Sequence, residues 1–254
     1  MTAYEPLGLG VPGYRAWYCP ETGSTNDDAL ERAEVGETEG LVLVAGVQSR
    51  GRGRQGRTWH SRQGSSLAFS VLFRPTPAEA SCLARFTALG ALALVEVLRE
   101  NYHADALLKW PNDVLLGGKK VSGVLPEVSW QNGQPVGVVL GMGVNLRPGT
   151  TPPGLAMLYP ASDLQAETGQ EIPARELLAL ILAKMNALRG LLTHEDFISL
   201  WNSRLAFRDQ FATLNSPEDG PARVRVVAVN GDGSLSVVDE TGAARRFYSA
   251  EFSS

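Results

Sequence analysis

The sequence predicts an α+β protein: a mixed β-sheet domain flanked by helices, followed by a small SH3-like β-barrel. Three observations predict this fold. Apolar, β-branched runs alternate with stretches of helical periodicity through most of the chain. Two of these runs flank an Asn-Gly pair, a strong signal for an antiparallel hairpin. The C-terminal stretch contains only short runs joined by tight turns, which is typical of a small barrel. We therefore expect two domains, residues 1–207 and 208–254.

The first elements expected are a helix and two buried strands. The helical pattern at 24–35 opens on a serine and a threonine, each followed three residues later by an aspartate, which resembles a capping box. Apolar runs at 41–47 and 66–73 indicate strands that are buried on both faces. Residues 78–100 have the clearest helical periodicity and predict one long helix.

The second half of the chain begins with strands. Its hairpin turn is Gln131-Asn132-Gly133-Gln134, because Asn-Gly accepts positive φ. A Pro/Gly-rich loop at 147–154 separates the hairpin from two helices, and three short strands follow them. The expected strands and helices of this half are, in order, 121–130, 136–146, 174–192, 195–206, 223–229, 234–238 and 243–248.

Composition excludes several classes of protein. The 254 residues are 44% hydrophobic and 20% charged, with a net charge of -4, so neither disorder nor general nucleic-acid affinity is indicated. Cys19 and Cys82 are far apart and form no disulfide or zinc pattern. We find neither a signal-peptide pattern nor an apolar stretch long enough to span a bilayer. These observations predict a cytoplasmic protein without membrane contact.

Common hydrolase motifs are also missing. The three histidines, His60, His103 and His194, form neither HExxH nor a clustered metal spacing, and there is no Gly-x-Ser-x-Gly elbow. A covalent serine nucleophile or a zinc-activated water is therefore unsupported. The residue types that do cluster are those that bind anions.

The first such cluster is an arginine loop, residues 51–57. The wider stretch 40–78 contains no Asp or Glu but six arginines, and the loop alternates glycine with arginine. Glycines allow close approach of the backbone to a ligand, and arginines add forked donors, which suits a phosphate or carboxylate. The spacing is not that of a P-loop. A flexible surface loop or an RNA-binding segment remains the alternative.

The second cluster holds three of the four lysines of the chain. Lys109 begins the sequence Lys-Trp-Pro-Asn-Asp, which ends at Asp113, and Lys119-Lys120 follow shortly after. Pro111 restricts the backbone before it, so the neighbouring side chains have defined directions. The alternative is a turn capped by Asn and Asp with solvated lysines.

Two further segments give weaker signals of a binding site. Ser24-Thr25-Asn26 presents two hydroxyls and an amide to a polar ligand, but the same residue types also cap helices. Gly141 and Gly143 end an apolar strand before Asn145, whose amide has the donor and acceptor needed to read an adenine edge. A simple strand-end turn is the alternative.

These segments, in this order, resemble the biotin–protein ligase family. The resemblance is strong from Ser24 to Leu146 and weaker at the C-terminus. It implies condensation of biotin with ATP to biotinyl-5′-AMP and pyrophosphate, then transfer of biotin to a carrier lysine. Such chemistry needs preorganised cations and N–H donors rather than a nucleophile. The matching residues are Ser24-Thr25-Asn26, Gln48, Gly51–Trp59 (51–59), Lys109-Trp110-Pro111-Asn112-Asp113, Lys120-Val121-Ser122-Gly123, Glu127 and Gly141-Met142-Gly143-Val144-Asn145.

The resemblance also implies roles for individual residues. Those expected at biotin are Ser24, Thr25, Asn26, Gln48, Arg52, Gly53, Arg54, Lys120 and Gly123. Those expected at ATP or the adenylate are Arg52, Arg54, Arg57, Trp59, Lys109, Asn112, Lys120 and Asn145. Lys120, Arg54 and Asp113 are the expected catalytic residues. Mg²⁺ is an expected cofactor, with Asp113 as its candidate ligand.

The implied partner is a biotin carboxyl carrier protein, of acetyl-CoA carboxylase or another biotin-dependent carboxylase. The stretch before Ser24 is too short for the winged-helix domain of some members, so we expect no DNA binding. The protein is expected to be a monomer or a homodimer, with residues 50–57 ordering on ligand binding. Two alternatives remain: a lipoate or octanoate ligase of the same superfamily, and a non-enzymatic RNA-binding module.

Overall fold

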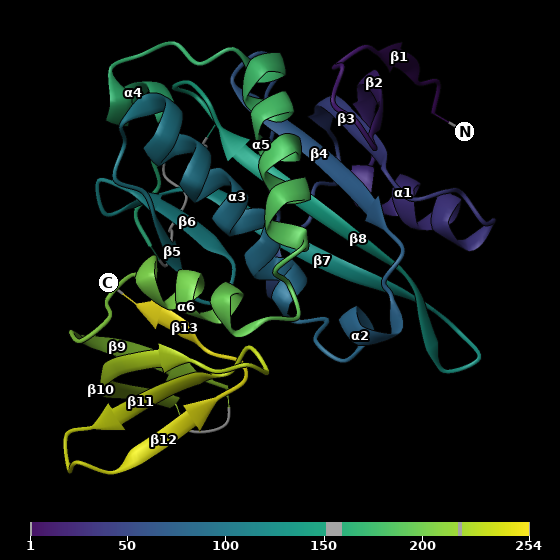
Figure 1. The fold of residues 1–254 in the computed structure, drawn as a ribbon. Helices are drawn as coiled ribbons and strands as arrows, with labels where there is room; N and C mark the ends of the chain where they lie inside the picture. The colour runs from purple at the N-terminus through teal and green to yellow at the C-terminus, as the bar shows by residue number, and fades with distance from the viewer. Residues whose placement is uncertain (1, 151–158, 218–219, 254) are drawn as a thin grey trace.

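The computed structural model describes residues 2–150, 159–217 and 220–253. Its centre is a sheet in the order β1-β2-β3-β4-β8-β7-β6-β5, shown in Figure 1. Only β2 and β3 pair in parallel, so the sheet is mixed, as predicted. The strands are β1 (Glu5–Leu7), β2 (Arg15–Thr22), β3 (Leu41–Gln48), β4 (Ser66–Phe73), β5 (Leu107–Lys109), β6 (Asp113–Leu116), β7 (Lys119–Gln131) and β8 (Gln134–Asn145).

Helices cover both faces of this sheet. Helix α1 (Thr25–Glu34) packs on one face against a small cluster that includes Leu43 and Val139. Helices α3 (Arg85–Tyr102) and α5 (Ala174–Arg189) lie side by side on the opposite face (Figure 1). Because side chains alternate along a strand, each central strand contributes to both cores. The sheet is thereby buried on two sides, which explains the continuous apolar runs.

A second, antiparallel sheet follows at the C-terminus, in the order β12-β11-β10-β9-β13. It has two strands more than predicted, and β12 and β13 are not paired with each other in the described residues, so the sheet is open. Helix α6 (Glu195–Ser203) contacts β10. The proposed boundary at residue 207 stays a prediction. The strands are β9 (Phe211–Ser216), β10 (Gly220–Val229), β11 (Leu235–Asp239), β12 (Ala244–Phe247) and β13 (Glu251–Ser253).

The predicted hairpin and the first helix are confirmed. Asn132 and Gly133 both have positive φ, 51° and 74°, and join β7 to β8 in a tight turn. Ser24 caps α1, its hydroxyl accepting a hydrogen bond from the backbone N–H of Asp27 at 3.5 Å. The strands predicted at 41–47 and 66–73 are β3 and β4.

The single helix predicted at 78–100 is wrong. A capping box between Thr76 and Glu79 starts the short helix α2 (Pro77–Ala80), and a turn separates it from α3. In that turn the backbone N–H groups of Cys82 and Arg85 donate to carbonyls three residues back. Hydrogen bonds of this three-residue span form 3₁₀ turns, which are more tightly wound than an α-helix. Apolar periodicity continued through the turn because Leu83 still packs against the core.

Other boundaries differ by smaller amounts. Helix α5 ends at Arg189 and α6 at Ser203, three residues before the predicted ends. The sequence did not predict β1, β2 or the short helix α4 (Leu164–Thr168). Of the loop predicted at 147–154, residues 151–154 lie outside the described part of the chain. No helix in the described part is long and apolar enough to cross a membrane.

Candidate active site

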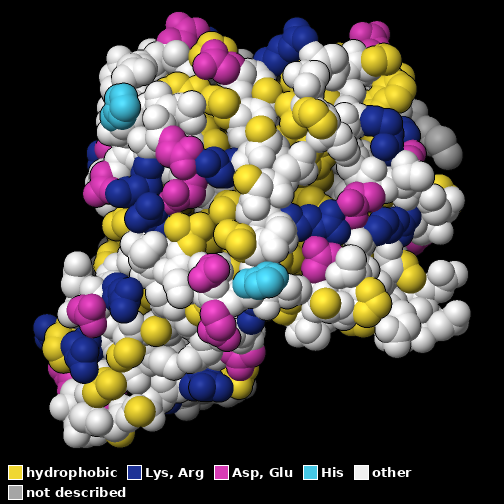
Figure 2. All heavy atoms as spheres, in the orientation of Figure 1, with side chains coloured by type: hydrophobic (Ala, Val, Ile, Leu, Met, Phe, Trp, Pro, Cys, Tyr) yellow, Lys and Arg dark blue, Asp and Glu magenta, His cyan; other side chains and the backbone are white. Residues whose placement is uncertain are grey.

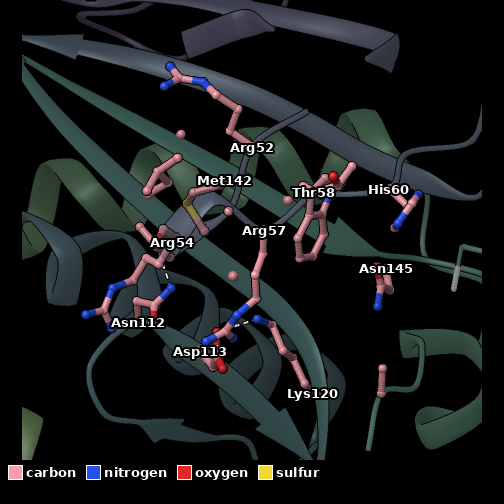
Figure 3. A pocket seen from close by; sticks show the side chains of 18 of the residues that line it. Arg52, Arg54, Arg57, Thr58, His60, Asn112, Asp113, Lys120, Met142 and Asn145 are labelled. Carbon is pink, nitrogen blue, oxygen red and sulfur yellow. Dashed lines mark hydrogen bonds and ion pairs between the residues drawn. The ribbon is translucent and has the colours of Figure 1, made fainter. Parts of the chain in front are cut away.

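A cavity of about 490 Å³ opens on the face of the large sheet that carries α1. Every residue that the sequence predicted for the site lines it: Ser24, Thr25, Asn26, Gln48, Arg52, Gly53, Arg54, Arg57, Trp59, Lys109, Asn112, Asp113, Lys120, Gly123 and Asn145. Figure 3 shows Arg54 and Asn112 at one end of the cavity, and His60 and Asn145 at the other. The structure brings the predicted residues together, and their individual roles stay predictions.

The arginine loop folds back on itself over this cavity. The backbone N–H of Gly53 donates to the carbonyl of Arg57 at 2.7 Å, and that of Trp59 to the carbonyl of Gly51 at 2.9 Å. A Cβ at Gly51 would lie 2.4 Å from the carbonyl oxygen of Trp59, so this position requires glycine. The glycines therefore allow a narrow loop that presents its arginines in different directions.

Each of the three central arginines has its own partners. Arg52 points away from the cavity floor and pairs with Asp27 and Glu127, the latter at 2.7 Å (Figure 3). The Nη1 of Arg54 donates to the Oδ1 of Asn112 at 3.3 Å. Burial lowers the pKa of Arg54, because the charged guanidinium is poorly solvated there.

Arg57 connects the loop to the second sheet. Its Nη2 lies 2.6 Å from the Oε1 of Glu251 on β13, and the side chain of Glu251 is 16% exposed. Phe252 also lines the cavity. The C-terminal sheet thus supplies part of the wall, which the sequence pattern did not reveal.

The reacting end of the cavity holds a carboxylate between two lysines. Hairpin pairing of β5 with β6 places Lys109 opposite Asp113, and its Nζ donates to Oδ2 at 2.8 Å. The Nζ of Lys120, from β7, lies 2.6 Å from Oδ1. Burial by itself raises the pKa of Asp113, but the charges of Lys120 and Lys109 outweigh it, so the pKa lies below its ordinary value. Asp113 is therefore ionised. Together with Lys109 and Lys120 it forms a cluster of one net positive charge.

A buried polar network lies beside the N-terminus of α1. Gln48 Oε1 accepts from the N–H of Thr25 at 2.8 Å and from its hydroxyl at 3.1 Å. Ser70, fully buried on β4, donates to Asn26 Oδ1 at 2.6 Å. The Nδ2 of Asn26 donates to Glu127 at 2.7 Å and to the carbonyl of Leu125. The protein itself therefore uses both ends of the Asn26 amide.

This network changes which groups face a ligand. Because Thr25 holds Gln48 by its oxygen, the Nε2 of Gln48 is left without a hydrogen-bond partner in the described residues. The hydroxyl of Ser24 is an acceptor for the helix N-terminus. The Asn26 amide is therefore engaged by protein groups, whereas Gln48 offers a donor to a polar head group. Contact of Asn26 with biotin stays a prediction.

Two paired glycines line the cavity beneath the indole of Trp59. Gly123 on β7 pairs directly with Gly143 on β8, and the indole of Trp59 covers both. A Cβ at Gly143 would lie 2.1 Å from the indole ring. The Nζ of Lys120 lies 5.8 Å from the centroid of the same ring. The position of the arginine loop and the position of the Lys120 side chain are therefore linked through Trp59.

Another part of the cavity wall comes from a segment that the sequence did not single out. Tyr159 and Ala161 line the cavity, and the Tyr159 ring lies 5.1 Å from the Nζ of Lys109. The Nδ2 of Asn145 donates to the carbonyl of Ser162 at 2.9 Å, which fixes its amide. No motif marks this segment, because it reaches the site only through tertiary structure.

The arrangement joins two chemical environments in one cavity. One part of the cavity offers hydrogen-bonding groups for a neutral polar head group, and the reacting end offers Arg54, Arg57 and Lys120 for anions. Cations fixed in a poorly hydrated site stabilise developing negative charge strongly. The cavity therefore fits a reaction in which a carboxylate meets a phosphate.

Comparison with known proteins supports this conclusion. The sequence model of the biotin/lipoate A/B protein ligase family matches residues 19–145, half of the chain. The biotin–[acetyl-CoA-carboxylase] ligase of Paracoccus denitrificans is 33% identical over 233 residues, covering 87% of this chain and 90% of that protein. The chain belongs to this family.

Two further similarities extend beyond the matched region. The bifunctional ligase/repressor BirA of Bacillus subtilis (strain 168) is 29% identical, with 96% of this chain and 75% of BirA covered. A biotin protein ligase from Aquifex aeolicus, solved in complex with biotin and ATP, superposes with a TM-score of 0.78 at 29% identity. That match covers 94% of this chain and 97% of the other. The α+β fold predicted from the sequence is thereby confirmed for this member of the biotin/lipoate A/B protein ligase family.

Proposed function

We propose that the protein is a biotin–protein ligase, which activates biotin as biotinyl-5′-AMP at the expense of ATP and transfers it to a lysine of a carrier protein. The observation that carries this proposal is the cavity itself, where a polar pocket beside Gln48 adjoins the lysines around Asp113. Relatives in the same family are named biotin–[acetyl-CoA-carboxylase] ligases. A similar structure was solved with biotin and ATP.

In this proposal the biotin ureido group lies beside Thr25 and Gln48, and its carboxylate extends toward Lys120. The carboxylate attacks the α-phosphorus of ATP, the bond from that phosphorus to the β-phosphate oxygen breaks, and pyrophosphate leaves. Lys120 and Arg54 stabilise the charge that develops on the α-phosphate. Asn145 contacts the adenine. The incoming lysine amine then attacks the acyl carbon, and AMP leaves.

Asp113 does not fit the role of a Mg²⁺ ligand in this arrangement. Both of its oxygens already hold lysines, at 2.8 and 2.6 Å. Among the described residues no group of three or more His, Cys, Asp or Glu side chains is placed to bind a metal ion. A requirement for Mg²⁺ together with ATP stays a prediction. No step of the proposed reaction uses a metal ion bound to Asp113.

The lipoate alternative is disfavoured by the polar network. A dithiolane ring offers no hydrogen-bonding group to Gln48 or to the α1 N-terminus, and a site built for such groups rejects analogues that lack them. The RNA-binding alternative is disfavoured by charge: Figure 2 shows acidic and basic side chains interspersed on the face drawn, and the chain is acidic overall.

The partner proposed is a biotin carboxyl carrier protein, as the names of the relatives suggest. The oligomeric state, the absence of DNA binding and ordering of residues 50–57 by ligand remain predictions. A gel shift with biotin and ATP tests the second, and tryptic cleavage at the loop arginines with and without ligand tests the third.

The proposed function is tested by mass spectrometry. Incubation of the protein with ATP and biotin should yield biotinyl-5′-AMP, and addition of a carrier domain should give one biotin on one lysine. Lipoate and octanoate, offered in parallel, should give neither product. Adenylation of lipoate in preference to biotin would assign the protein to the other branch of its family.

A further inference from the structure

Glu167 on α4 lies outside the cavity but holds its wall. Its Oε1 accepts hydrogen bonds from the Ser162 hydroxyl at 2.6 Å and from the Lys119 Nζ at 2.9 Å. These two bonds keep the pKa of Glu167 below its ordinary value, so the side chain is ionised. The Glu167 side chain is 13% exposed and that of Lys119 is 49% exposed, so water screens the ion pair and the part-buried hydrogen bond from Ser162 is the better shielded of the two contacts.

The groups that Glu167 holds lead directly to the reacting end. The backbone N–H of Lys120 donates to the carbonyl of Pro160 at 2.8 Å, and that of Ser162 to the carbonyl of Lys120 at 2.9 Å. Successive side chains on a strand point to opposite sides, so Lys119 reaches Glu167 while Lys120 reaches the cavity. The carbonyl of Ser162 also accepts from Asn145. One carboxylate thus fixes the segment that orients Lys120 and Asn145.

The turn between β6 and β7 is shaped around the same carboxylate. Gly117 has φ +57°, and a Cβ there would lie 2.2 Å from the Oε2 of Glu167. Its neighbour Gly118 has φ +72° but nothing within 4 Å of such a Cβ. The two glycines therefore share a backbone conformation, and only Gly117 is in contact with Glu167.

We propose that Glu167 is a positioning residue for the nucleotide half of the site. It holds Lys120 and Asn145 in one arrangement, so that affinity for ATP depends on it. The ureido group of biotin binds in the polar pocket beside Gln48, on other elements, β3 and α1, so biotin affinity depends on Glu167 much less than ATP affinity does. This inference rests on the proposed function, because it takes from it the contact of Asn145 with adenine and the position of Lys120 between the biotin carboxylate and the α-phosphate.

The test measures the KM for ATP and the KM for biotin separately in the full chain. Glu167→Ala should raise the KM for ATP about tenfold, the effect of one lost charge-assisted hydrogen bond, and change that for biotin less than about twofold. Glu167→Gln keeps an acceptor for Ser162 and should recover part of the loss. Gly117→Ala should displace the carboxylate and raise the KM for ATP, whereas the matched variant Gly118→Ala adds comparable backbone strain without touching Glu167 and should keep the wild-type KM for ATP.

Direct binding separates this inference from the proposed function. ATP affinity of wild type and Glu167→Ala by calorimetry should differ by the same factor. Equal ATP affinity, or equal losses for ATP and biotin, would overturn the role of Glu167. Absence of biotin adenylation by wild type, with ATP binding still weakened in Glu167→Ala, would instead count against the proposed function alone.

Discussion

Asp113 shows how a single buried carboxylate organises the charges of the cavity. Lys109 is only 3% exposed, so its ammonium depends on Asp113 for a partner. The other oxygen holds Lys120, whose side chain is 21% exposed and reaches the cavity. Two buried cations without the carboxylate would repel each other in a medium that screens charge poorly. We therefore propose that Asp113 acts on the reaction through the position of Lys120.

The first prediction concerns Asp113→Asn. Removing one partner of a buried ion pair leaves an uncompensated charge, so the free energy of unfolding should fall by about 3 kcal/mol. Activity should fall as well, because Lys120 loses the group that orients it. Urea unfolding and adenylation rates measure both. Asp105→Asn, which removes an exposed partner of Arg99, is the control and should change neither. Unchanged stability of Asp113→Asn would contradict the account.

At this scale the sequence predicted the cavity residues well where they belong to compact motifs. The arginine loop and the lysine cluster each contribute several site residues that are close to one another in the sequence. Ser70 and Glu251 were not predicted, because each is a single polar residue in an ordinary strand. The prediction for Asn26 was incomplete for a similar reason: its partners Ser70 and Glu127 are distant in sequence.

At the scale of elements, Arg189 connects the end of α5 to α2 and to the segment just before β3. Its Nε donates to Glu79 on α2 at 2.7 Å, and its Nη1 to Glu39 at 2.6 Å. Arg189 holds the pKa of Glu79 below its ordinary value despite the burial of that group. Glu79 lies in α2, just before the break between α2 and α3. The continuous helix that periodicity predicted would have neither the cap that starts α2 nor the turn that follows it.

The second prediction concerns Arg189→Ala. It should lower the free energy of unfolding by about 2 kcal/mol, because Glu79 is left buried with weaker partners. Since the folded-state pKa of Glu79 is lowered, its contribution is present above the ordinary pKa and is lost as pH falls through the folded value. Wild type should therefore lose more stability than the variant when the pH is lowered from 6 to about 3. Thermal unfolding at both pH values measures this difference, with Arg175→Ala as control, which removes only an exposed hydrogen bond from the same helix to the carbonyl of Gly8. Parallel losses would contradict it.

At the scale of the whole molecule, the cavity is completed by both sheets. The large sheet provides the floor, and β13 provides Glu251 and Phe252. The Nε1 of Trp110 donates to the carbonyl of Gly233 at 2.9 Å, which holds the second sheet beside the lysine cluster. The sequence indicated the small sheet from its turns but not its contact with the site, because β13 is three residues long and lies in a different part of the chain.

The third prediction concerns Glu251→Ala. Loss of its ion pair with Arg57 should free the arginine loop and lower the kcat/KM of adenylation about tenfold. Stability should change by less than about 1 kcal/mol, because the arginine is 42% exposed. Glu240→Ala, which removes an exposed partner of Arg223 on the same sheet, should have wild-type activity. Equal activity of the two variants would contradict a role for β13 in the site.

The most direct test of the account is biotin-dependent exchange of labelled pyrophosphate into ATP, with wild type and Lys120→Ala side by side. Wild type should exchange with biotin and not with lipoate, and Lys120→Ala should lose about 100-fold in rate, the usual effect of removing one preorganised charge-stabilising donor. Exchange that needs no biotin, or that is as fast in Lys120→Ala as in wild type, would contradict the proposal that this cavity activates biotin through Lys120.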